Sequence, residues 1–255
     1  MDFSEKLSNK IFEFVILVQS LGKKNEYLYK INNTSFYIRK NTSDIFNISE
    51  IWNNKVYNIK IKKEDNIIDL GANIGAFTIF AANKTTDGKV FAFEPEYSNY
   101  QQLVKNINLN KLKNTFAYKL GIADKKCNRP LFLSDISKTS SSIYESHTGN
   151  IEKIDCIPLK SVLKLCDIKK IDLLKMDVEG AEYDILFSAP KNILRRISCI
   201  ILEFHNFLNL KYNHKDLVIF LKKNDFEVSV CSPRKFIPQK LYTSLSKKGI
   251  LKAIK

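Results

Sequence analysis

The stretch Asp69-Leu70-Gly71-Ala72-Asn73-Ile74-Gly75 ends a short apolar run and leads into a helical pattern that extends to Ala82. Small residues in a turn between a strand and a helix allow a ligand to approach the backbone closely. The spacing differs from the G-x-G-x-x-G pattern of dinucleotide-binding turns, and Asp69 can accept a hydrogen bond from an amine, directly or through water. The stretch therefore favours a cationic amino-acid ligand over a pyrophosphate. The alternative is a tight turn with a capping Asp and no ligand.

Around this turn, short apolar runs alternate with helical patterns. Continuous apolar runs of this length are typical of buried parallel strands. Their alternation with helices predicts an α/β sheet that carries helices on both faces. The predicted strands are residues 67–70, 90–93, 171–174 and 199–202, and the predicted helices are residues 74–82, 97–110 and 215–223.

An N-terminal addition precedes the alternating pattern. Apolar positions recur at helical spacing over residues 3–21, which predicts an amphipathic helix. Two strand patterns, residues 27–31 and 35–39, flank Asn32-Asn33 and predict a hairpin. We therefore divide the chain into an N-terminal helix and hairpin, residues 1–60, and an α/β domain, residues 61–255. Within that domain, residues 134–149 are rich in Ser and Thr and predict a loop.

The composition indicates a folded, basic chain. Its 255 residues, 44% of them hydrophobic, can bury one good-sized core. The net charge of +14 suits nucleic acid, an anionic membrane or an acidic glycan, but the lysines are spread along the chain and form no tract. The five cysteines lack C-x-x-C and zinc-type spacings, so we expect reduced thiols. Residues 1–10 lack the pattern of a secretory signal, and the apolar residues 12–18 are too few to cross a bilayer, so we expect a cytoplasmic protein without a transmembrane segment.

Two acidic residues follow the next strands of the predicted sheet. Glu94 comes about 20 residues after the glycine turn, where nucleoside-binding sheets place an acid for the ribose hydroxyls. The alternative for Glu94 is a surface carboxylate before Pro95. Asp124 follows Gly121-Ile122-Ala123, which we expect to close the third strand of the sheet. Asp124 could there reach an adenine amine, or it could simply be a turn Asp.

Further acids gather where the fourth and fifth strands of the predicted sheet end. Asp177, Glu179 and Glu182 lie within six positions, a costly arrangement unless they face a site. Glu203 and His205 should share one side of their strand, because side chains alternate. His205 is either structural or, since His titrates near neutral pH, a candidate base. We assign no metal ligand, although Asp177, Glu203 and His205 could together hold a divalent ion.

Five motifs stand in the order and spacing of FkbM-type methyltransferases, which this chain resembles from about Asn66 to His205. One departure is Leu159-Lys160, where the family usually has Leu-Asp. The resemblance implies a class I Rossmann-like methyltransferase domain, with a mostly parallel seven-stranded sheet and helices on both faces. It also implies S-adenosylmethionine as the cofactor. The motifs are residues 69–75, 92–95, Leu103 with 106–110, 139–143 and 175–182.

The resemblance also implies roles for individual residues. The methionine end of the cofactor would be lined by the turn, Glu94 would hold the ribose, and Asp124 would lie on the adenine side. The turn residues concerned are Asp69, Gly71, Asn73 and Gly75.

Family likeness favours methyl transfer to a hydroxyl of a sugar, glycan or secondary metabolite, with a base that takes the hydroxyl proton. We predict Asp177, His205 and Glu203 as the catalytic residues. The basic charge supports an alternative, an RNA or other nucleic-acid methyltransferase, but the chain lacks an Asn-Pro-Pro-Tyr type motif and an RNA-binding module. A non-catalytic nucleoside-binding domain is a third hypothesis, which the intact acids disfavour.

Overall fold

The computed structural model describes residues 25–133, 150–206, 211–231 and 248–255. The predicted helix at residues 3–21, the predicted loop at residues 134–149 and the motif at residues 139–143 lie outside these ranges. Within the described ranges, no helix is both long enough and apolar enough to cross a membrane.

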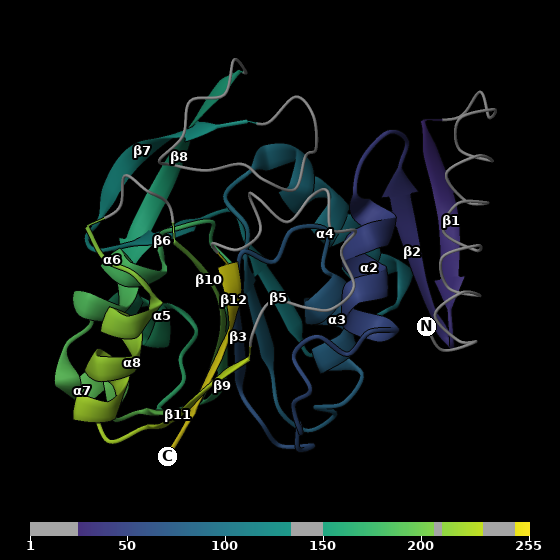
Figure 1. Cartoon of the computed structure of the whole chain (residues 1–255). Coiled ribbons are helices and arrows are strands. Elements are labelled where there is room, and N and C mark those ends of the chain that lie inside the picture. The colour runs from purple at the N-terminus through teal and green to yellow at the C-terminus, as the bar shows by residue number, and fades with distance from the viewer. Residues whose placement is uncertain (1–24, 134–149, 207–210, 232–247) are drawn as a thin grey trace.

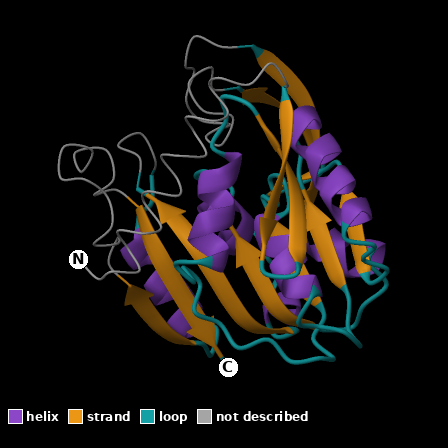
Figure 2. Ribbon diagram, turned by 90° about the vertical axis from the view of Figure 1, so that its right-hand side faces the viewer, coloured by secondary structure: helices purple, strands orange, loops and turns teal. Residues whose placement is uncertain are grey.

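Seven strands from the described residues form a central sheet in the order β11-β12-β10-β9-β3-β4-β5. The four predicted apolar runs are confirmed as β3, β4, β9 and β10. Figure 2 shows the strands of this sheet as a row of adjacent arrows. Their bounds are β3 (Ile67–Leu70), β4 (Val90–Phe93), β5 (Thr115–Tyr118), β9 (Ile171–Met176), β10 (Ile197–His205), β11 (Glu227–Cys231) and β12 (Lys248–Ile254).

Among the described residues the sheet has seven strands, as expected, and it is mixed: four of its six pairings are parallel and two are antiparallel. The pairings that link β5, β4, β3, β9 and β10 are all parallel. In contrast, β12 runs antiparallel to both of its neighbours, β10 and β11. The last strand of the chain therefore enters the sheet in reverse, between two strands that precede it in the sequence.

Along the chain, the third strand of the central sheet is β5. The segment before Asp124 was expected to form this strand, and the structure corrects that expectation. That segment is β6 (Gly121–Ala123), which pairs with β8 (Ile151–Pro158) in a separate three-stranded sheet of order β6-β8-β7. The remaining strand of the small sheet is β7 (Cys127–Phe132). In Figure 1 the small sheet lies above helix α6 (Glu182–Phe187).

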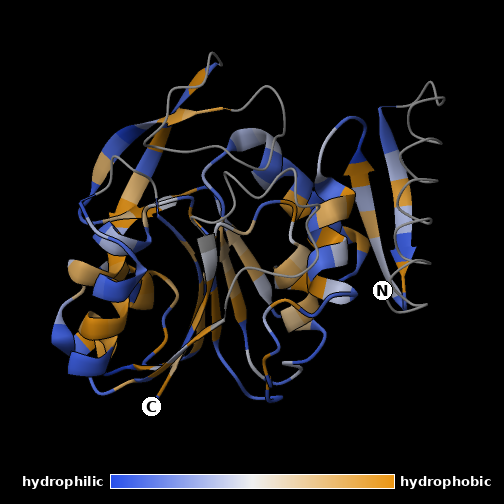
Figure 3. Ribbon diagram, in the orientation of Figure 1, coloured by the Kyte–Doolittle hydropathy of each residue, from blue (hydrophilic) through white to orange (hydrophobic). Residues whose placement is uncertain are grey.

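Helices cover both faces of the central sheet, as predicted (Figure 1). Alternation along β3 sends Ile67 into a core cluster with Phe77, and Ile68 into the opposite cluster with Leu217. Figure 3 shows that the central strands are mainly hydrophobic, which fits burial between two helical layers. One layer contains α2 (Asp44–Trp52), α3 (Ala76–Ala82) and α4 (Tyr97–Leu109); the other contains α5 (Leu159–Leu165), α6, α7 (Lys191–Leu194) and α8 (His214–Lys223).

The predicted hairpin is confirmed: β1 (Glu26–Ile31) and β2 (Thr34–Arg39) pair around Asn32-Asn33. Side-chain amides of α4 bind the backbone of β2. The N–H of Tyr37 donates to Oδ1 of Asn106 at 2.7 Å, and the N–H of Ser35 donates to Oδ1 of Asn110 at 3.0 Å. These amides satisfy strand N–H groups as a neighbouring strand would. The motif at residues 106–110 therefore anchors the hairpin.

The four cysteines whose side chains are described, Cys127, Cys156, Cys166 and Cys199, are free thiols. Burial raises the pKa of Cys156 and Cys199 to about 11 and of Cys166 to about 12. These three are therefore protonated and unreactive at neutral pH.

Candidate active site

A cavity of about 300 Å³ opens where β3, β4 and β9 end. The carboxyl ends of parallel strands are the usual ligand-binding edge of α/β sheets. Helix α2 and the small sheet complete the wall, so segments from both sides of the glycine turn contribute. The polar side chains of the wall are Asn47, Glu50, Tyr57, Asn73, Glu94, Glu96, Asn99, Arg129, Lys175, Asp177, Glu179 and Glu203.

Packing explains both glycines of the turn. Gly71 has a φ of +72°, and a Cβ there would lie 1.8 Å from the carbonyl oxygen of Asp177. Gly75 has a φ of +92°, and a Cβ there would lie 2.7 Å from Cδ1 of Leu103. Gly71 and Asn73 line the cavity, whereas Gly75 lies outside its wall against α4. The turn thus needs glycine to approach neighbouring parts of the protein, in addition to any ligand.

Asp69 lies behind the cavity wall. Its fully buried carboxylate accepts a hydrogen bond from Oγ1 of Thr78 at 2.6 Å and lies 3.0 Å from Nζ of Lys175. The same Nζ donates to the carbonyl of Gly71 at 2.8 Å. Burial favours a lower pKa for Lys175, but the charges of Asp69 and Asp177 outweigh it and raise that pKa. Asp69 therefore supports a cationic Lys175 on the wall and does not itself reach into the cavity.

Glu94 is buried and faces the cavity, as the sequence predicts for a ribose-binding acid. Its two carboxylate oxygens accept backbone N–H groups of Asn73 at 2.8 Å and of Glu96 at 2.9 Å. Burial raises the pKa of Glu94 to about 8, although these two hydrogen bonds favour the ionised form. Each oxygen keeps a second lone pair, so the carboxylate can still accept from two ligand hydroxyls.

Asp124 lies outside the cavity wall and forms an ion pair with Arg129. Arg129 lines the wall, so Asp124 would act on a ligand through this guanidinium. The wall near β6, β7 and β8 is otherwise apolar and could cover a flat ring. Its apolar residues there are Ile122, Leu131 and Ile154.

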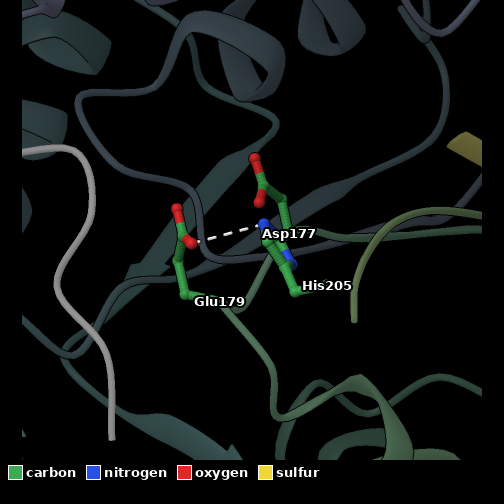
Figure 4. A group of neighbouring side chains, drawn as sticks. All are labelled: Asp177, Glu179 and His205. Carbon is green, nitrogen blue, oxygen red and sulfur yellow. Dashed lines mark ion pairs between the residues drawn. The ribbon is translucent and has the colours of Figure 1, made fainter. Parts of the chain in front are cut away.

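Carboxylates surround His205 where β9 and β10 end (Figure 4). Its Nδ1 lies 2.9 Å from Oε1 of Glu182, and its Nε2 lies 3.3 Å from Oε2 of Glu179 and 3.9 Å from Oε1 of Glu203. Burial favours a lower pKa for His205, but the charges of Glu179, Glu182 and Glu203 outweigh it and raise the pKa to about 10. His205 is only 2% exposed and lies outside the cavity wall, whereas Glu179 and Glu203 line it.

Glu182 organises the loop between β9 and α6. Its side chain is fully buried, and Oε1 accepts the N–H of Gly180 at 3.2 Å and of Val178 at 3.4 Å, besides its contact with His205. Glu179 in the same loop has a φ of +49°. Of the three acids predicted to face a site, Asp177 and Glu179 do so, and Glu182 supports them from behind.

Asp177, Glu179 and His205 each offer a donor atom, and these atoms lie within 4.8 Å of one another. The metal alternative drawn from the sequence grouped Asp177 and His205 with Glu203. In the structure, Glu179 replaces Glu203 as the third residue of the group.

Sequence reasoning assigned no role to Lys175 or to α2. Glu50 and Tyr57, on and just after α2, reach the wall beside Asp177 and Glu203. Burial, and then the charges of Asp177, Glu203 and Glu50, raise the pKa of Tyr57 well above its usual value, so its phenol stays protonated. No pattern within residues 44–57 indicates this role, because it depends on how α2 packs.

Residues 69–228 match the model of the methyltransferase FkbM domain. The chain belongs to the FkbM methyltransferase family. This confirms the resemblance drawn from the motifs, and the protein is an S-adenosylmethionine-dependent methyltransferase.

Individual proteins show the same likeness. Methyltransferase 1 of Beauveria bassiana is 25% identical to this FkbM-family chain over 223 residues, which cover 78% of this chain and 88% of that protein. Methyltransferase sdnD of Sordaria araneosa is 24% identical over 209 residues, which cover 69% and 80%. The structure of M. jannaschii TYW2 in complex with AdoMet has a TM-score of 0.51 at 16% identity and covers 91% of this chain and 86% of that chain. This last likeness supports the class I methyltransferase fold.

The cavity fits S-adenosylmethionine in charge and in hydrogen-bonding capacity. Besides Glu94, whose raised pKa keeps it largely protonated at neutral pH, the wall carries five acidic side chains against the two cations Lys175 and Arg129, although the chain as a whole has a net charge of +14. An excess of acid suits a ligand that carries a sulfonium and an ammonium group. Glu94, which directly follows β4 and accepts the N–H of Asn73 in the turn, offers oxygens for a pair of hydroxyls.

Proposed function

We propose that the protein transfers a methyl group to a hydroxyl oxygen of a sugar, glycan or secondary metabolite. The observation that carries this proposal is the acid-rich end of the cavity, where Asp177, Glu203 and Glu50 line the wall with Tyr57. Carboxylates accept hydrogen bonds and donate none when ionised, so this end suits an acceptor rich in hydroxyl donors.

The other end of the cavity would hold the cofactor. Glu94 would accept the two ribose hydroxyls, and Gly71 and Asn73 would contact the methionine portion. The apolar wall beside Arg129 would cover the adenine, with Asp124 orienting the guanidinium. Asp69 and Gly75 lie outside the cavity wall, so in this proposal they position the turn and do not contact the cofactor.

Asp177 is the base in this proposal. S-adenosylmethionine, when bound, supplies a methyl group on a sulfonium sulfur. The carboxylate of Asp177 would accept the proton that the acceptor hydroxyl loses when its oxygen receives that methyl group. Glu203 lines the same region and would orient the hydroxyl. His205 lies behind the wall with both ring nitrogens facing carboxylates, so it would position Glu179 and Glu203.

The experiment is turnover with S-adenosylmethionine on pooled sugars, glycans and hydroxylated metabolites, with RNA assayed in parallel. Mass spectrometry should find a mass gain of one methyl group, which chemical O-demethylation removes, on a hydroxylated acceptor. Methylation of RNA alone, or of nitrogen atoms alone, would contradict the proposed acceptor class.

A further inference from the structure

We propose that Asp177, Glu179 and His205 bind one divalent transition-metal ion at the acid-rich end of the cavity. The site is distinct from the cofactor-binding residues, and nothing in the proposed methyl transfer requires it.

The three donors converge from two neighbouring strand ends (Figure 4). Asp177 and Glu179 follow β9, and His205 ends β10, which pairs with β9 in parallel. Their donor atoms lie within 4.8 Å of one another. Two ligands on opposite sides of an ion, each at about 2.1 Å, would lie about 4.2 Å apart. Side-chain rotations that move each donor by less than about 1 Å would therefore close the site.

An independent contact gives His205 the orientation of a metal ligand. Its Nδ1 meets Oε1 of Glu182 at 2.9 Å, so its Nε2 points toward Glu179, 3.3 Å away. Metal-binding His residues commonly donate their other ring N–H to a carboxylate, which fixes the tautomer and the ring orientation. Glu182 also holds the backbone of the loop that carries Glu179, through the N–H of Gly180. One buried carboxylate thus positions two of the three ligands.

Local charge favours a cation at this place. Asp177, Glu179 and Glu203 line the wall here, and Glu182 lies directly behind. Of the two cations nearby, Lys175 is held by Asp69 at 3.0 Å, and His205 would lose its Nε2 proton as the ion binds. Because buried like charges repel, a divalent ion would relieve the excess of carboxylates.

The donor set selects the class of ion. Two carboxylates and one imidazole suit Mn²⁺, Co²⁺ or Zn²⁺, whereas Mg²⁺ and Ca²⁺ prefer oxygen ligands alone. In the ion-bound protein Asp177 is a ligand, and Glu203 remains as the carboxylate that can take a proton. This last consequence alone rests on the proposed function.

The experiment titrates chelator-treated protein with Mn²⁺ and follows the loss of the free-ion signal by electron paramagnetic resonance. We expect one Mn²⁺ per chain with a micromolar dissociation constant. Asp177→Asn and Glu179→Gln should each weaken binding at least about tenfold, since each removes a ligand charge. Glu182→Gln keeps an acceptor for Nδ1 and should weaken binding by about 10–100-fold.

The matched control is Glu50→Gln, which removes a wall carboxylate outside the group and should change affinity less than about threefold. Circular dichroism checks that each variant is folded, and a fixed concentration of Mn²⁺ should raise the melting temperature of the parent more than that of Glu179→Gln. The proposal is overturned if no ion binds more tightly than about 1 mM, or if Glu179→Gln binds as tightly as the parent. The Mn²⁺ titration contains neither the methyl donor nor a methyl acceptor. A failure to bind Mn²⁺ therefore leaves the proposed methyl transfer untouched.

Discussion

Asp69 and Lys175 lie directly opposite each other on β3 and β9, and their charged groups meet at 3.0 Å. Both side chains are almost fully buried. The Lys175 ammonium also donates to the carbonyl of Gly71, whose backbone packs against that of Asp177. A single buried ion pair therefore joins the glycine turn to the loop that carries the acids.

Breaking this pair from one side should destabilise the protein strongly. Lys175→Met leaves the Asp69 carboxylate buried without its cation, so the free energy of unfolding should fall by about 3–5 kcal/mol. The double variant Asp69→Asn with Lys175→Met removes both charges and should recover much of that loss. Denaturant unfolding measures both values. If the double variant loses as much free energy of unfolding as Lys175→Met and Asp69→Asn lose in total when made singly, the pair is not coupled.

The affinity for S-adenosylhomocysteine should rise with pH up to about pH 8. Burial raises the pKa of Glu94 to about 8, with the charge of Glu96 raising it and that of Lys175 lowering it. Ribose hydroxyls donate to the ionised carboxylate, so binding below this pH must release a proton. Affinity should then increase by up to about tenfold per pH unit and level off above pH 8. Calorimetry in buffers of different ionisation enthalpy measures the released proton.

Glu94→Gln provides the comparison for that titration. It keeps one acceptor but carries no proton to release, so its affinity should be flat across this pH range and lower than that of the parent by about 1.5–3 kcal/mol above pH 8. A parent profile that is flat between pH 6 and pH 8, or a variant that binds as tightly as the parent above pH 8, would contradict the ribose-binding role of Glu94.

The basic charge should produce only non-specific binding to nucleic acid. Such binding depends on counterion release, so it should weaken steeply between about 50 mM and 200 mM salt. Fluorescence anisotropy with a mixed panel of RNAs tests this. Tight binding to one structured RNA at physiological salt would favour a nucleic-acid acceptor over a small hydroxylated one.

The sequence predicted the strands that lie in the middle of the sheet better than the others. β3, β4, β9 and β10 contain short continuous apolar runs because helices cover them on both faces. β5 is partly exposed, and its sequence Thr-Phe-Ala-Tyr gives no such run. β12 contains lysines at residues 248 and 252 and pairs with strands that end well before it in the chain. Its place depends on tertiary pairing, which no local pattern encodes.

Strand-end reasoning found the acids of the candidate site but not their supports. Glu94, Asp177 and Glu203 were predicted to face the site, and all three line the cavity. The opposition of Asp69 and Lys175 depends on the register of β3 and β9, which the sequence leaves open. Likewise, the hydrogen bond of Glu182 to His205 joins residues 23 positions apart.

Asp177 should matter more to turnover than to cofactor affinity. Asp177→Asn keeps the shape of the side chain but removes the carboxylate, as base or as ion ligand, so kcat should fall by about 10²–10⁴ at saturating donor. The dissociation constant for S-adenosylhomocysteine should change less than about threefold, because the ribose and adenine contacts lie at the other end of the cavity. The matched control is Asp172→Asn, at the opposite end of β9 and outside the cavity wall, which should keep the parental kcat.

Chelation then separates the role of Asp177 as a base from its role as an ion ligand. If turnover uses Asp177 only as a base, chelator leaves the parent active; if turnover also uses the bound ion, chelator lowers the parental kcat and Mn²⁺ restores it. An Asp177→Asn variant that turns over at the parental rate would remove Asp177 from both roles.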